Sequence, residues 1–134
     1  QEHGSYIIEA LETGRTYRGH FNIVNNRCIS NLPGDCVIET PVYVNKKGFR
    51  VPKVGDLPLG CAAVCSASVH VQRLAVEAAV HGDVSLLKQA MMMDPLTGAV
   101  LNPPEIWELT DEMLIAQEHW LPQFSDYIQT LKKP

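Results

Sequence analysis

Polar side chains that could contact a ligand stand at two places in the first thirty residues. His3 precedes a predicted helix, where a ligand could reach its imidazole, and Asn25 and Asn26 occupy a predicted turn of a sheet. Asparagine amides carry the paired donors and acceptors that sugar hydroxyls require, but the same amides stabilise turns by bonding to the backbone. A histidine near a terminus is also commonly a solvated side chain. Both interpretations of these three residues stay open at this point.

Acid–base chemistry has one isolated candidate, Glu39, within the run NLPGDCVIETP that spans residues 31–41. A carboxylate between apolar neighbours could act as a general acid. Most glycosidases need two carboxylates, so Glu39 is better explained as an outward-facing strand residue or a member of a buried ion pair. The sequence contains no glycine-rich dinucleotide motif, no phosphate loop, no His-Glu-x-x-His and no Gly-x-Ser-x-Gly. We therefore assign no catalytic residue.

Metal binding would have to use the four cysteines, Cys28, Cys36, Cys61 and Cys65. Zinc sites favour short Cys-x2-Cys or Cys-x4-Cys spacings, which neither pair shows. Cys61 and Cys65 fall one turn apart on a predicted helix, where small apolar thiols pack well. We therefore expect buried free thiols. Two disulfides or a zinc-binding module are the alternatives, and we assign no residue to a metal.

Composition narrows the class of partner. The chain carries a formal net charge of −4, and its lysines and arginines form no cluster. Nucleic acids and anionic membranes are therefore not expected as partners. Polar residues interrupt the longest apolar stretch, residues 61–80, which argues against a membrane span. The sequence starts without methionine or a signal-peptide pattern, so we expect a processed or excised piece of a cytoplasmic protein.

Periodicity predicts the elements that must position these residues. Apolar alternation and turn residues predict strands, and a spacing near 3.6 predicts helices. Helices are expected over residues 5–12, 59–81, 84–92, 96–101 and from 103 onward, and extended segments over 17–24, 28–32, 36–44 and 49–51. The result is an α+β fold, a small antiparallel sheet packed with several helices, in a single domain over residues 1–134.

Helix-capping residues and an apolar helix add detail. Gly82 ends the long helix, Asp83 caps the next, and Asn102 with Glu105 forms a capping box around the last. The long helix over 59–81 is apolar on nearly every side of its first half, which places it in an interior or an interface. His70 and Arg73 then make a polar seam toward a neighbour, and we expect a homo-oligomer.

Several short stretches occur in an order that identifies a family. They are EHGSYIIEA (2–10), NLP (31–33), VIETP (37–41), VGDLP (54–58), VQRLAVEA (71–78), MDPLT (93–97), EIWEL (105–109) and WLP (120–122). Together they resemble the C-terminal part of glycoside hydrolase family four, closest to its α-galactosidase and α-glucosidase, melibiase-like branch. The resemblance extends from the first residue to about Phe124.

The resemblance implies more than the residues show. Family members join an N-terminal NAD-binding Rossmann domain to a C-terminal α+β domain like that of lactate and malate dehydrogenases. They hydrolyse glycosides by a redox route with NAD⁺ and usually Mn²⁺, outside the two-carboxylate scheme. The nucleotide loop, metal motif and base region lie upstream of this chain, so no catalytic, NAD or metal residue carries over. His3, Asn25 and Asn26 are then candidates for the sugar side of the cleft.

Two functions from different classes follow. The first is a C-terminal domain fragment of an NAD- and Mn-dependent glycosidase that hydrolyses α-galactosides or related α-glycosides when intact, with its own N-terminal domain as partner. Such a fragment alone is expected to bind neither cofactor and to be inactive. The second is a non-catalytic interaction or oligomerisation domain with the same fold. A polar, open cleft would favour the first, and a filled apolar cleft the second.

Overall fold

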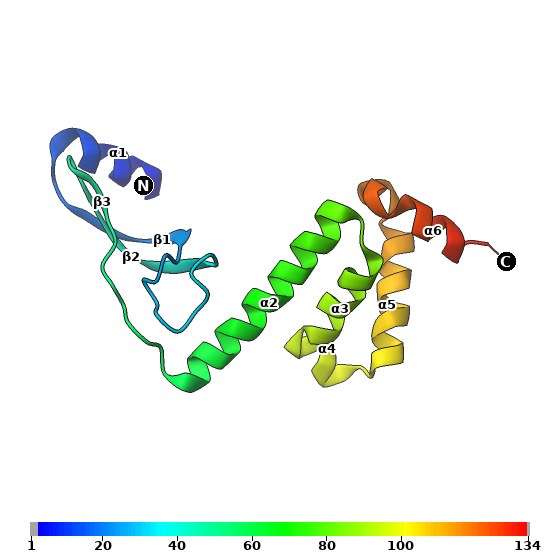
Figure 1. Cartoon of the computed structure of the whole chain (residues 1–134). Helices are drawn as coiled ribbons and strands as arrows, with labels where there is room; N and C mark the ends of the chain where they lie inside the picture. Colours follow the sequence, from blue (N-terminus) through cyan, green and yellow to red (C-terminus); the bar gives the residue numbers. More distant parts are fainter. Residues whose placement is uncertain (1–2, 134) are drawn as a thin grey trace. The chain divides into compact units, whose positions relative to one another are not determined.

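The computed structural model describes residues 3–133, so Glu2, which opens the first matching stretch, lies outside them. The chain divides into two compact units, the first ending at Ala63 and the second starting at Val64. The first unit combines a helix with a three-stranded sheet, and the described part of the second consists of helices and their connections (Figure 1). The predicted α+β class is confirmed. The single domain over 1–134 stays a prediction.

A small meander forms the sheet of the first unit. Strands β1 (Tyr17–Val24), β2 (Val37–Asn45) and β3 (Gly48–Arg50) pair antiparallel in that order. Gly48 has φ +99, which lets the turn between β2 and β3 close after only two residues. The predicted segments 17–24, 36–44 and 49–51 thus match the strands to within about one residue at each end.

Helix α1 (His3–Thr13) covers this sheet and forms the core of the first unit with it. Residues of β2 alternate between buried and less buried, so that Val42 and Val44 point to one face. These two valines form a buried cluster with Ala10, onto which the partly buried side chains of Ile7, Leu11, Tyr17, Phe21 and Ile23 pack. Helix α1 therefore lies across the start of β1, which determines where its first residue, His3, can reach.

The predicted extended segment 28–32 is wrong. It forms only an isolated bridge, Ile29 to Gly55, within a loop. The side chain of Asn25 organises that loop, because its amide nitrogen donates to the carbonyls of Ile29, Leu32 and Pro33 at 2.9–3.2 Å. The loop backbone is thereby paired with a side chain instead of a neighbouring strand.

Helix α2 (Leu59–His81) begins and ends where the sequence predicts, between Pro58 and Gly82. Its composition and length are those of a helix that could cross a membrane, so the sequence-based argument against a span does not hold on these criteria alone. The core helix of a soluble protein meets the same criteria. Large apolar side chains on α2, including Val64, Val76 and Val80, are exposed in this chain.

Local capping divides the next helices. Asp83 accepts the Leu86 amide at 3.0 Å and starts α3 (Val84–Met93). Asp94 then accepts the Thr97 amide and hydroxyl at 2.8 Å and starts the short helix α4 (Pro95–Val100). An aspartate side chain can satisfy these first amides because no helical carbonyl precedes them.

The remaining helices complete the second unit. The predicted capping box at the start of α5 (Pro103–Ala116) is confirmed, with Asn102 and Glu105 bonding each other's backbone amides. Two 3-10 turns and α6 (Ser125–Leu131) follow, and the sequence did not predict them. Leu114, Phe124 and Ile128 are buried together, with Val84, Leu87, Leu121 and Tyr127 packed against them.

Candidate functional site

An aromatic cluster lies between α1 and the sheet of the first unit. Its members are His3 and Tyr6 from α1, Tyr17 and Phe21 from β1, and Phe49 from β3. Tyr6 stacks on Tyr17 with ring centroids 5.3 Å apart, and His3 lies 4.7 Å from Phe21, which meets Phe49 edge to face at 6.0 Å. Such a series of rings presents flat apolar faces of the kind that bind sugars and other rings.

His3 is held in this cluster by three contacts. Its Nδ1 makes a hydrogen bond of 2.7 Å with the hydroxyl of Tyr17, and its ring packs on Phe21. The third contact is with bare backbone, since a Cβ placed on Gly19 would collide with Cε1 of His3. The imidazole is nevertheless exposed, and Nδ1 is engaged. His3 is therefore a positioned side chain, in a setting that the sequence did not reveal.

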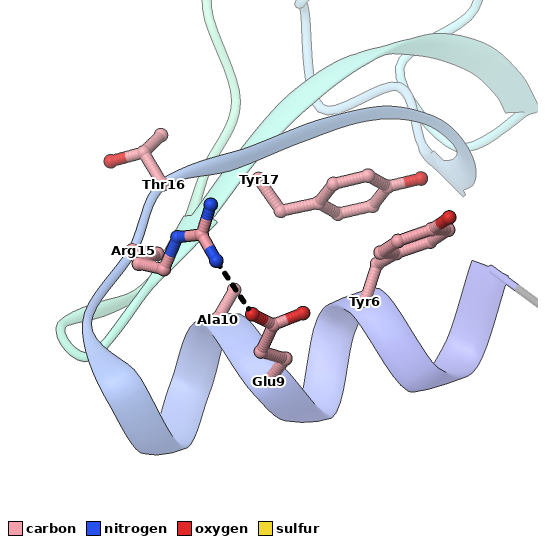
Figure 2. A pocket seen from close by; sticks show the side chains of 6 residues that line it. All are labelled: Tyr6, Glu9, Ala10, Arg15, Thr16 and Tyr17. Atoms are coloured by element: carbon pink, nitrogen blue, oxygen red, sulfur yellow. Dashed lines mark hydrogen bonds and ion pairs between the residues drawn. The ribbon is translucent and has the colours of Figure 1, made fainter. Parts of the chain in front are cut away.

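A shallow pocket of about 310 Å³ opens beside the cluster (Figure 2). The stacked rings of Tyr6 and Tyr17 form one side, and Arg15 pairs with Glu9 at 3.0 Å on the other. This ion pair is largely exposed, so it adds little to stability. Its charges can instead offer a donor and an acceptor to a polar ligand. Ala10 and Thr16 complete the lining.

Asn25 and Asn26 do not join His3 in one site. Asn25 is 1% exposed, and its side-chain oxygen accepts the Ile29 amide at 2.7 Å, so its amide is committed to the loop. Asn26 is exposed and has φ +41. Asn25 lies four positions after Phe21, just beyond the end of β1, which corresponds to roughly 13 Å at the usual rise of a strand. Burial argues against a sugar contact for Asn25, whereas the contacts predicted for Asn26 and His3 stay predictions.

Glu39 and the cysteines stand apart from this cluster. Glu39 is exposed on β2 opposite Asn22, in agreement with an outward-facing strand residue. All four cysteines are free, and Cys28 donates to the carbonyl of Pro52 at 3.1 Å. Cys28 and Cys36 are buried as expected, but Cys61 is exposed, so the expectation of buried thiols is wrong there.

A second polar arrangement, which the sequence did not predict, lies in the other unit. Lys88 of α3 donates to Asp111 at 2.9 Å and to the Tyr127 hydroxyl at 2.8 Å, and that hydroxyl donates to Asp111 at 3.0 Å. The Lys88 ammonium also lies 5.1 Å from the ring centroid of Trp107. Burial alone would lower the pKa of Lys88, but the hydrogen bonds and charges of Tyr127 and Asp111 outweigh it and raise that pKa. A lysine held protonated in this way cannot act as a base, so we interpret the arrangement as structural.

The comparison with protein families then identifies the chain. Residues 1–97 match the C-terminal domain of the family 4 glycosyl hydrolases, and the chain belongs to this family. It is 52% identical over 132 residues to an α-galactosidase of Rhizobium meliloti, covering 98% of the chain and 27% of that relative. It is 34% identical over 124 residues to an α-galactosidase of Bacillus subtilis, covering 92% of the chain and 29% of the relative.

Solved structures show the same fold. A 6-phospho-α-glucosidase from gut microorganisms, in complex with NAD and glucose 6-phosphate, is 25% identical and covers 87% of this chain with a TM-score of 0.75. The 6-phospho-β-glucosidase of Thermotoga maritima, with manganese, NAD⁺ and glucose 6-phosphate, is 26% identical and covers 88% with a TM-score of 0.76. The chain covers 26% and 30% of these two structures, so it spans about a quarter of its relatives' length.

Proposed function

We propose that this chain is the C-terminal domain of an NAD- and Mn²⁺-dependent glycosidase that hydrolyses α-galactosides or related α-glycosides. The identity of 52% to the Rhizobium meliloti α-galactosidase carries the proposal, because it extends over nearly the whole chain. The Thermotoga maritima structure with manganese, NAD⁺ and glucose 6-phosphate supports the cofactors. The wider family also includes relatives named for phosphorylated sugars, so the natural glycoside is the finer part of the proposal.

Both cofactors are expected to bind in the remainder of the protein. Among residues 3–133 no group of three His, Cys, Asp or Glu side chains could hold a metal ion. NAD and manganese would supply redox chemistry and charge stabilisation from sites in the remainder of the protein. The role of this chain is then to shape the sugar side of the cleft. His3 is the side chain best placed for it, because it is exposed and held by Tyr17 and Gly19.

The partners belong to the proposal as well. The rest of the intact protein provides an N-terminal NAD-binding domain, and the assembly is a homo-oligomer in the cytoplasm. Val76 and Val80, one turn apart on α2 and both exposed, support association, because an exposed apolar patch can mark an interface.

The test is the activity of the intact gene product. We expect it to hydrolyse p-nitrophenyl α-galactoside with NAD⁺ and Mn²⁺, and to lose that activity on removal of either. The 134-residue chain assayed alone is the control and should be inactive. If the intact protein hydrolysed a 6-phosphoglucoside and not the galactoside, the proposed substrate would change to the phosphorylated sugar. If the intact protein turns over no glycoside under these conditions, the interaction-domain alternative replaces the enzyme.

A further inference from the structure

An apolar groove lies in the second unit between α2 and α3. It has a volume of about 520 Å³ and is lined by Ala67, His70, Arg73, Leu74, Glu77, Leu86 and Met93. Ala67, Leu74, Leu86 and Met93 supply its apolar surface, and His70, Arg73 and Glu77 supply polar groups of both signs. An apolar centre with polar residues beside it is the usual anatomy of a protein interface.

Helix α3 has two apolar faces, and within residues 3–133 one of them packs against other helices while the other lines the groove. Leu87 faces the buried cluster of α5 and α6, and together with Met91 it lines a separate hollow against α5. Leu86 and Met93, seven residues apart and therefore on one side of the helix, line the groove. The fold of the second unit explains the first face. The second face needs another explanation, because Met93 remains 62% exposed.

Exposed apolar side chains also occur on α4, the helix that follows α3. Leu96 and Val100 are one turn apart on this helix and are 81% and 80% exposed. Large exposed apolar patches are rare on monomeric proteins, so we expect a partner to cover apolar side chains of this region.

Two observations identify the occupant. The chain spans 27% and 29% of its α-galactosidase relatives, so about three-quarters of such a protein lies outside this structure. All groove residues lie within residues 1–97, which match the family's C-terminal domain. A surface within the family's shared domain is the natural place for contact with the rest of a family member. A covalent link that can span the two sites raises the effective concentration of such a partner.

We propose that the α2–α3 groove is the docking surface for the N-terminal part of the same polypeptide, which inserts apolar side chains between Leu74, Leu86 and Met93. This proposal rests on the proposed function only in assuming that such an N-terminal part exists. Its test uses protection and mass, not activity, so failure of the groove is distinguishable from failure of the glycosidase assignment.

Methionine oxidation tests the proposal without any mutation. Met93 faces the groove, and Met91, two residues away, lines the hollow against α5. Both are oxidised with dilute hydrogen peroxide in the 134-residue chain and in the intact protein, and fragment-ion mass spectrometry separates them. Oxidation rates of methionine follow exposure, so we expect Met93 to react about tenfold more slowly in the intact protein, with Met91 unchanged. Equal Met93 rates in the two proteins would overturn the proposal.

A charged substitution separates the N-terminal part from a second copy. Because Met93 is exposed in this chain, Met93→Glu should leave the melting temperature of the 134-residue chain unchanged and lower that of the intact protein. The mass of the intact protein, measured by light scattering, should be the same with and without Met93→Glu. The control is Trp120→Glu, at a side chain that is 74% exposed outside the groove, which should change neither protein. A fall in mass with Met93→Glu would assign the groove to a second copy instead. If Met93→Glu and Trp120→Glu lowered the melting temperature of the intact protein equally, the groove would not be the docking surface.

Discussion

The two units use buried polar groups in opposite ways. In the first unit, Asn25 is neutral and 1% exposed, and both the nitrogen and the oxygen of its side-chain amide bond to the backbone of one loop. In the second unit, Lys88, Asp111 and Tyr127 join three helices through a charge, with side-chain exposures of 12% for Lys88 and 25% for Asp111. A neutral amide fixes local backbone at any pH, whereas a charged arrangement couples distant elements and depends on protonation. Substitutions in each unit should show this difference.

Asn25→Ala should have the largest effect. It removes every side-chain bond to Ile29, Leu32 and Pro33 and leaves buried backbone groups unpaired. Unpaired buried groups cost about 1–3 kcal/mol each, so we expect a loss of about 3 kcal/mol in the free energy of unfolding. Urea denaturation monitored by circular dichroism measures it.

The neighbouring Asn26→Gly is the matched control for that loop. Asn26 is exposed with φ +41, a conformation that glycine adopts freely, so stability should change by less than about 0.5 kcal/mol. A similar loss in both variants would show that the turn, and not the Asn25 amide, holds the loop. Under the proposed glycosidase function, the KM of the intact Asn26→Gly protein also measures whether this side chain touches the sugar.

Lys88→Met should have the second largest effect, about 2 kcal/mol, because it leaves Asp111 partly buried without its cation. The partial exposure of the pair keeps this below the value for a fully buried one. Tyr127→Phe, which removes only the hydroxyl, should cost less. If Lys88→Met were neutral, the charged arrangement would not couple the helices of the second unit.

The same lysine predicts an alkaline limit for the second unit. Its pKa is raised in the folded protein, so its contribution is full below the ordinary value of 10.5 and is lost as pH rises through the higher folded value. Stability of the wild-type chain should therefore fall above about pH 10.5, and Lys88→Met should flatten that fall. Denaturation midpoints from pH 8 to 11.5, in roughly half-unit steps, give the comparison.

How many of these contacts could be predicted from the sequence depends on how far apart the two partners lie along the chain. Asp83 and Asn102 cap helices whose amides are three residues away, so their pattern is visible in the sequence. Lys88 lies 23 residues from Asp111 and 39 from Tyr127, and no local pattern indicates such a meeting.

The candidate site shows the same limit. His3 could be named from its residue type and place, but its partner Tyr17 is 14 residues away, and the role of Gly19 is visible only once the ring packs on it. The sequence over 28–32 resembled a strand. Its backbone bonds to the side chain of Asn25 instead of a neighbouring strand, and such a contact gives no periodic pattern of apolar residues in the sequence. Elements with local signals were thus predictable, and contacts between elements were not.

Gly19→Ala tests whether the first unit also positions a functional side chain. The new methyl group would displace the His3 ring, and overpacking of this kind costs about 1 kcal/mol at a site that can yield. We expect the NMR signals of the His3 ring to move. Under the proposed glycosidase function, KM for the α-galactoside should rise in the intact protein, with kcat changed less. Gly34→Ala is the control, since nothing lies within 4 Å of its Cβ position. An unchanged KM alongside displaced His3 signals would exclude His3 from the sugar site.

Asp94 should give the smallest effect and the opposite pH dependence from Lys88. Hydrogen bonds from the backbone amide and then the hydroxyl of Thr97 lower the pKa of the partly buried Asp94 carboxyl. A lowered pKa stabilises the fold above the ordinary value of 3.8, and this contribution disappears as pH falls through the folded value. Asp94→Asn keeps a capping oxygen but removes the charge, so it should be slightly less stable than the wild type at pH 7, and this difference should shrink as pH falls below the ordinary value of 3.8. A difference that persisted unchanged at acid pH would mean that the contact with Thr97, and not the charge, holds α4 on α3.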